Sequence, residues 1–187
     1  MKQTQRAGGR LLVFFVGVAL GCFGCFSAVA DTLERGLFSI EYHPDDAADA
    51  AWAGDVLTEA MKEYAVHLPA GETPVRVVLA HTVDEFLREA GDMARLSVAG
   101  FARGNEGLIV IKGPRLRLPG DDVKGTLRHE LVHVLLARNT NDAYLPRWLN
   151  EGIAMLLANE HTWASSMFVA RMFFQRSLIE YKDLDWK

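Results

Sequence analysis

The segment at residues 121–138 constrains the fold most, because it combines a helical apolar repeat with a pair of histidines. Asp121 or Asp122 is a suitable N-cap. His129 and His133 are four residues apart, so both imidazoles project from the same side of the predicted helix. Apolar residues at helical spacing should bury the rest of this helix: Val123, Leu127, Leu131, Val134 and Leu135. We therefore expect the histidines at the floor of a cleft.

The sequence His129-Glu130-Leu-Val-His133 is a candidate metal motif. Its spacing lets both imidazoles reach one tetrahedral zinc ion at about 2.0–2.1 Å. Glu130 lies one step round the helix, near enough to reach a metal-bound water. The alternative is structural, with two hydrogen-bonded histidines and Glu130 in a surface ion pair with Arg128 or a lysine.

A second motif, Leu145-Pro-Arg-Trp-Leu-Asn-Glu151-Gly-Ile-Ala154, opens the next predicted helix. If the two helices fold back on each other, Glu151 can face the histidines as a third ligand. Two His and one Glu leave a fourth position open for water, as a catalytic zinc site requires. Glu151 also lies in an apolar stretch, where a buried carboxylate is costly unless it is paired or metal-bound. The alternative is a surface glutamate beside Arg147.

On these two motifs the chain resembles the gluzincin metallopeptidases, specifically the peptidase MA-like domain family. The resemblance implies an α+β, zincin-like fold, in which a small mixed β-sheet packs against the active-site helix and the C-terminal part is helical. It also implies zinc as the cofactor, with His129, His133 and Glu151 as metal ligands and Glu130 as catalytic base.

Two features depart from the family pattern. Many gluzincins carry an acidic residue four positions after the ligand glutamate, where it orients a zinc-bound histidine. Met155 stands there in this chain, so another group must orient the histidine. In addition, only 36 residues follow Glu151, which suggests either a compact or a C-terminally truncated version of the domain.

Residues 1–30 have the features of a secretory signal peptide. Lys2, Arg6 and Arg10 precede an uncharged run at 11–30, which ends in the small-residue pattern Ser-Ala-Val-Ala. An uncleaved membrane anchor at 11–30 is the rival interpretation, and a lipid-anchored Cys22 is a third. Both cysteines lie within this segment, so residues 31–187, the predicted metallopeptidase domain, contain none. The predicted location is periplasmic or extracellular.

The remaining patterns predict one domain of strands and helices. Strands are expected at 37–42, 75–80 and 108–111, and helices at 45–68, 82–91, 121–138, 146–159 and 163–181. The run at 75–80 is almost wholly apolar, as in a strand buried on both faces. Residues 92–106 are expected to be irregular. The net charge is −4, and without residues 1–30 the balance is 17 basic against 24 acidic residues, so no nucleic-acid partner is predicted.

The leading hypothesis is an exported zinc metallopeptidase whose partner is a peptide or protein substrate. An extended substrate would pair with the exposed edge of the strand at 108–111. His161, Tyr144 and Tyr181 are candidate oxyanion donors. The other histidines, His43, His67 and His81, belong to no motif and are interpreted as ordinary surface or turn residues.

A second hypothesis belongs to another class of protein, a non-catalytic, zinc-stabilised binding module of the cell envelope. The short C-terminus and the missing acidic residue at Met155 favour it. The two hypotheses differ in one measurable property, since only the enzyme hydrolyses peptides through Glu130. A membrane partner is expected only if the segment at 11–30 stays uncleaved.

Overall fold

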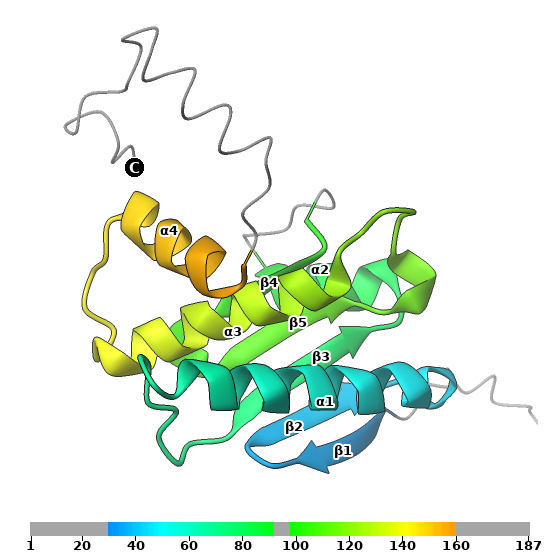
Figure 1. Ribbon diagram of the computed structural model, residues 1–187. Coiled ribbons are helices and arrows are strands. Elements are labelled where there is room, and N and C mark those ends of the chain that lie inside the picture. Colours follow the sequence, from blue (N-terminus) through cyan, green and yellow to red (C-terminus); the bar gives the residue numbers. More distant parts are fainter. Residues whose placement is uncertain (1–29, 92–97, 160–187) are drawn as a thin grey trace, which may run out of the picture.

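The structure is a computed structural model that describes residues 30–91 and 98–159. Its centre is a five-stranded sheet with the order β1-β2-β3-β5-β4 (Figure 1). The strands are β1 (Asp31–Arg35), β2 (Phe38–Tyr42), β3 (Val75–Ala80), β4 (Gly100–Arg103) and β5 (Leu108–Lys112). The inner strands β2, β3 and β5 are parallel to one another, and the two edge strands are antiparallel to their neighbours. The sheet is therefore small and mixed.

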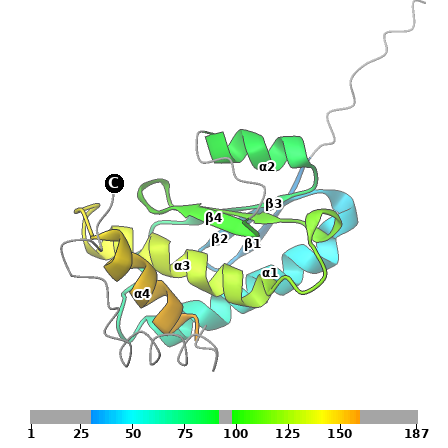
Figure 2. The ribbon, with the colours of Figure 1, turned by 90° about the horizontal axis from the view of Figure 1, so that it is seen from above.

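The helices lie on both faces of this sheet (Figure 2). They are α1 (Ala47–Tyr64), α2 (Val83–Ala90), α3 (Val123–Asn139) and α4 (Arg147–Leu157), with short 3-10 turns η1 (Pro44–Asp46), η3 (Gly104–Glu106) and η4 (Pro114–Leu116). Helices α1 and α3 cover one face, and α2 covers the other. This mixed α/β arrangement is compatible with the predicted α+β class.

The apolar core is divided by the sheet into two clusters. Val75, Val77 and Leu79 pack with α1 and α3 on one side, whereas Val78 and Ala80 pack with Phe86 of α2 on the other. This arrangement confirms the prediction that the strand at 75–80 is buried on both faces. A capping box begins α2, since Thr82 and Glu85 each accept a backbone N–H of the other.

Helix α3 has the buried face that its sequence predicts. Asp122 is the N-cap, and its Oδ1 accepts the backbone N–H of Gly125 at 2.9 Å. The five predicted apolar residues are all buried, and four of them are fully enclosed: Leu127, Leu131, Val134 and Leu135. This burial fixes the rotation of the helix, and with it the side on which His129 and His133 project.

Two predictions about the sheet are wrong. Residues 92–106 were expected to be irregular, but β4 forms at Gly100–Arg103 and pairs antiparallel with β5. As a result, the strand at 108–111 has no exposed edge, because β5 lies between β3 and β4. A strand of four residues containing glycine carries too little pattern to be recognised. The edge strand on this side of the described sheet is β4.

Several predictions concern residues outside the described ranges. They include the signal peptide or anchor at residues 1–30, of which 1–29 lie outside these ranges, and the helix at 163–181, and both stay predictions. Within residues 30–91 and 98–159, no helix combines the length and apolar content needed to span a bilayer.

Candidate metal centre

Helices α3 and α4 are joined by a tight connection that turns the chain back on itself. Asn141 and Asp142 have φ values of 49° and 57°, a left-handed conformation that these two residue types tolerate better than most. Pro146 then precedes the first turn of α4, whose Leu149 donates its N–H to the Pro146 carbonyl at 2.9 Å. Helix α4 consequently runs back across α3 (Figure 1).

This reversal brings the three predicted ligands together. Glu151 Oε2 lies 3.4 Å from His129 Nε2 and 3.8 Å from His133 Nε2. One donor atom from each residue lies within 4.8 Å of the other two. The imidazoles meet edge to face, with ring centroids 4.8 Å apart and ring planes at 73°. Their ring nitrogens therefore converge on the carboxylate instead of stacking side by side.

The separations fit the donor set of a tetrahedral zinc site. Zinc binds His nitrogen and Glu oxygen at about 2.0–2.2 Å, which places neighbouring donors of a tetrahedron about 3.3–3.6 Å apart. The observed 3.4 Å and 3.8 Å lie close to that range. A site of two imidazoles and one carboxylate can therefore hold zinc after small side-chain movements.

Asn150 holds one of the imidazoles in the orientation that a metal ligand needs. His133 Nδ1 is 3.0 Å from Asn150 Oδ1. Because a carbonyl oxygen accepts, this hydrogen bond puts the proton on Nδ1 and leaves the lone pair on Nε2, which faces Glu151. Asn150 thus orients the imidazole of His133, which Met155 cannot do because its side chain carries no carboxylate or amide oxygen. No sequence pattern identifies Asn150 as a functional residue, although it immediately precedes Glu151.

The surroundings of Glu151 favour its charged form. The hydrogen bond with His129 lowers the pKa of Glu151, and His133 and Arg147 act in the same direction, whereas partial burial opposes them. Arg147 Nε lies 3.8 Å from Glu151 Oε1, so the alternative partner considered from the sequence is also present. The Glu151 side chain is 43% exposed. The cost of full burial, which was part of the case for a metal ligand, therefore does not apply.

Glu130 is buried beside this group, with only 9% of its surface exposed. It follows His129 in α3, so its side chain leaves the helix about 100° round the axis. The structural alternative placed Glu130 in a surface ion pair with Arg128 or a lysine, and the burial of Glu130 does not fit a surface pair. The guanidinium of Arg128 binds Glu63 at 2.6 Å and lies over the Tyr64 ring.

A cavity of about 300 Å³ opens next to the candidate ligands. His133, Asn150 and Glu151 form one side of it, and Ala102, Gly104 and Asn105 of β4 and η3 form another. A larger cavity of about 470 Å³ lies elsewhere, between α1, the start of α3 and the end of α4, and contains none of the predicted site residues. Both histidines were expected at the floor of a cleft, but only His133 lines the smaller cavity.

The remaining candidates have different outcomes. Tyr144 is 76% exposed in the connection before α4. His161 and Tyr181 lie outside the described residues, so their suggested role as oxyanion donors stays a prediction. His43 and His81, interpreted as ordinary surface or turn residues, lie just after two strands, where their rings stack at 3.8 Å and form a second group with Asp45. No motif spacing connects them, since they follow different strands.

Comparisons with protein-family models, curated proteins and solved structures found no match for this chain. The geometry of His129, His133 and Glu151, which together form the α3–α4 site, is therefore the basis for a functional proposal.

Proposed function

We propose that this protein is an exported, zinc-dependent metallopeptidase with a zincin-like fold. The observation that carries the proposal is the convergence of His129 Nε2, His133 Nε2 and Glu151 Oε2 beside a cavity. Three protein ligands of this kind are characteristic of catalytic zinc sites, which keep a position open, whereas structural zinc sites use four.

The chain's own residues can be given roles in peptide hydrolysis. A zinc ion in this site would supply Lewis acidity and would allow water to be deprotonated near neutral pH. Glu130, which follows the candidate ligand His129 in α3, is proposed to accept the proton of the attacking water and to deliver it to the leaving amine. Asn150 holds His133 with Nε2 directed at the site.

The substrate is proposed to bind along β4 instead of along the strand at 108–111. β4 is the edge strand of the described sheet, and its Ala102 lines the same cavity as His133. An extended peptide can add to such an edge through main-chain hydrogen bonds. A peptide on β4 would pass beside the candidate ligands, so the cut bond and the metal would meet at this cavity.

The test is hydrolysis of a peptide library by the full-length chain loaded with zinc. We expect Glu130→Gln to keep zinc and to lower the hydrolysis rate by about 10²–10⁴-fold, the usual contribution of a general base. Glu59→Gln is the matched control, because Glu59 is an exposed residue of α1 whose side chain is 69% accessible. A Glu130→Gln protein that cleaves as fast as the parent contradicts the mechanism.

The burial of Glu130 also favours a second candidate, the non-catalytic, zinc-stabilised binding module. A carboxylate with 9% exposure is shielded from substrate as well as from water. This alternative predicts that chelation lowers the melting temperature while no peptide is ever cleaved. If the parent hydrolyses peptides and Glu130→Gln abolishes this activity, the binding-module alternative is ruled out.

A further inference from the structure

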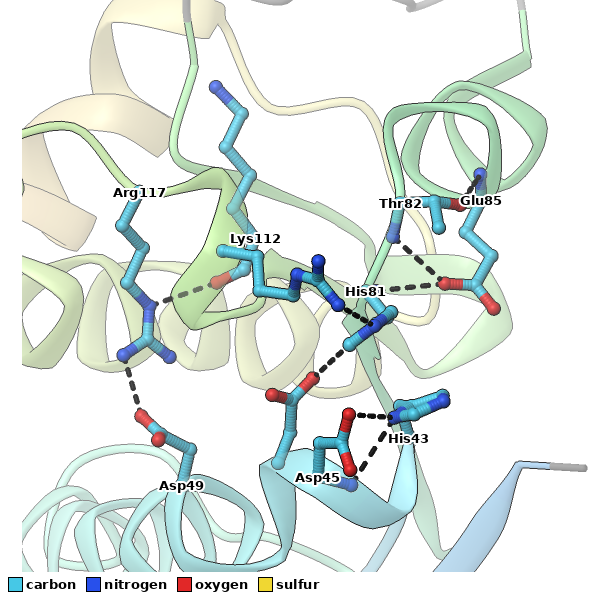
Figure 3. Close-up of polar contacts among 10 residues, drawn as sticks. His43, Asp45, Asp49, His81, Thr82, Glu85, Lys112 and Arg117 are labelled. Carbon is cyan, nitrogen blue, oxygen red and sulfur yellow. Dashed lines mark hydrogen bonds and ion pairs between the residues drawn. The ribbon is translucent and has the colours of Figure 1, made fainter. Parts of the chain in front are cut away.

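A second histidine group lies where three parallel strands end. His43 directly follows β2, His81 directly follows β3, and Arg115 lies in η4 just after β5. These strands are neighbours in the sheet and run in the same direction, so the residues after them meet at one edge. In sheets of this type ligands bind at the carboxyl ends of the strands. Figure 3 displays His43, Asp45 and His81 close together at this edge.

His81 is held in the orientation of a metal ligand. Its Nδ1 lies 2.8 Å from Oδ2 of Asp46, and the two side chains are only 10% and 5% exposed. The ionised carboxylate can only accept, so Nδ1 carries the proton and Nε2 has the lone pair. Arg115 Nη1, 3.1 Å from Nε2, fits this assignment because a guanidinium can only donate. A carboxylate on the far nitrogen is the usual support of a metal-bound histidine.

His43 and Asp45 place two further donors beside His81. His43 Nδ1 is 3.5 Å from Asp45 Oδ2, and one donor atom from each of the three residues lies within 4.8 Å of the others. The imidazole planes are 18° apart and stacked, so the two lone pairs lie in nearly parallel planes and one ring must turn to share an ion. His43 is free to do so, since its Nδ1 accepts only a long 3.2 Å bond from the Asp45 N–H and its side chain is 23% exposed.

We propose that His43, Asp45 and His81 form a second binding site for a divalent transition metal. Asp46 is the positioning residue, and the exposed Arg115 swings away from His81 Nε2 when the ion binds. Two imidazoles and a carboxylate suit zinc and similar ions, whereas calcium and magnesium prefer oxygen ligands alone. Asp45 and Asp46 place two carboxylates beside these imidazoles, and a divalent cation also compensates their charge. The group shares no residue with the α3–α4 site.

Metal stoichiometry in the full-length chain tests this proposal. Zinc titration should find two ions in the parent, one in His81→Ala, one in His129→Ala and none in the double variant. His67→Ala, which removes an exposed histidine of neither group, should keep two. A parent with a single ion that His129→Ala removes overturns the second site. A single ion that only His81→Ala removes supports the second site and contradicts the proposed function, so the two failures are distinguishable.

Two milder variants separate lost binding from lost folding. Asp45 is exposed, so Asp45→Asn should keep the parent's circular dichroism and melting curve while it weakens zinc binding in a His129→Ala background by about tenfold or more. Arg115→Ala should strengthen zinc binding in that background, because the guanidinium no longer competes for Nε2. If Arg115→Ala leaves the affinity unchanged or lowers it, the ion does not bind His81 Nε2 and the proposal is overturned.

Discussion

The two histidine groups are built in different ways. In the α3–α4 site both histidines belong to one helix, and the third ligand comes from the helix that packs on it. In the group after the strands, His43 and His81 come from separate strands, and the sheet alone makes them neighbours. The first therefore depends on the packing of helices, and the second on hydrogen bonds at the strand ends.

This difference predicts which perturbations each group can tolerate. Side chains around the α3–α4 site are positioned by contacts of α3 with η3 and α4. His81 is positioned instead by Asp46 and by Glu85, whose Oε2 accepts the His81 backbone N–H at 2.8 Å. Substitutions that disturb packing should affect the first group, and substitutions that remove hydrogen bonds should affect the second.

Gly104→Ala is expected to have the largest effect, because η3 lies directly against α3. A Cβ at Gly104 would come within 2.5 Å of Ala137 Cβ and 2.8 Å of the His133 carbonyl oxygen. Relieving this clash must move η3 or α3. We expect this movement to lower the free energy of unfolding by about 3 kcal/mol, the upper end of the usual range for overpacking. Urea denaturation should measure this loss, and zinc affinity at the α3–α4 site should fall with it.

Gly152→Ala is the matched control for that variant. Gly152 lies next to Glu151 in α4, and a Cβ there meets nothing within 4 Å. Alanine should raise the free energy of unfolding by about 0.5–1 kcal/mol, since glycine is a poor residue inside a helix. Equal destabilisation by Gly104→Ala and Gly152→Ala would contradict the dependence of the α3–α4 site on the packing of helices.

The α3–α4 site could be predicted because its residues are close together in the sequence. Four-residue spacing places His129 and His133 on one side of any helix, whatever the rest of the fold. The position of Glu151 required only that the next helix turns back. Asn150 could not be identified, because the hydrogen bond to His133 depends on the angle at which α4 crosses α3.

The group after the strands could not be predicted because its residues are distant in sequence. His43 and His81 become neighbours only through the parallel pairing of β2 and β3, and sequence patterns do not reveal which strands pair. The edge strands were difficult for another reason. β1 is largely exposed and β4 has four residues, so neither shows clear alternation.

The apolar repeat of α1 marks its buried face only in part. Trp52, Val56, Ala60 and Tyr64 recur every four residues, but Trp52 is 39% exposed. Steps of four residues advance about 40° more than a full turn, so such a row drifts round the helix. Ala53 and Leu57 complete the buried face instead.

Asn150→Ala tests the α3–α4 site with a smaller change. Removing the Oδ1 that accepts from His133 Nδ1 frees the imidazole to rotate and to change tautomer. We expect zinc affinity to fall by about tenfold, or about 1.4 kcal/mol. Competition with a chelator of known affinity measures it. Unchanged affinity would mean that Asn150 does not position His133. The second group serves as the control, since it should bind zinc in Asn150→Ala as it does in the parent.

Thr82→Ala tests the second group and should have the smallest effect. Thr82 Oγ1 accepts the Glu85 backbone N–H at 3.2 Å, and Glu85 Oε2 in turn holds the N–H groups of His81 and Thr82. Loss of this cap should cost about 1 kcal/mol of stability. Thr73→Ala, in the exposed loop before β3, is the matched control. Zinc binding in a His129→Ala background should weaken for Thr82→Ala and not for Thr73→Ala, because only the first loosens the backbone of His81. A loss of zinc at the α3–α4 site in Thr82→Ala would instead mean that the two groups are coupled through the sheet.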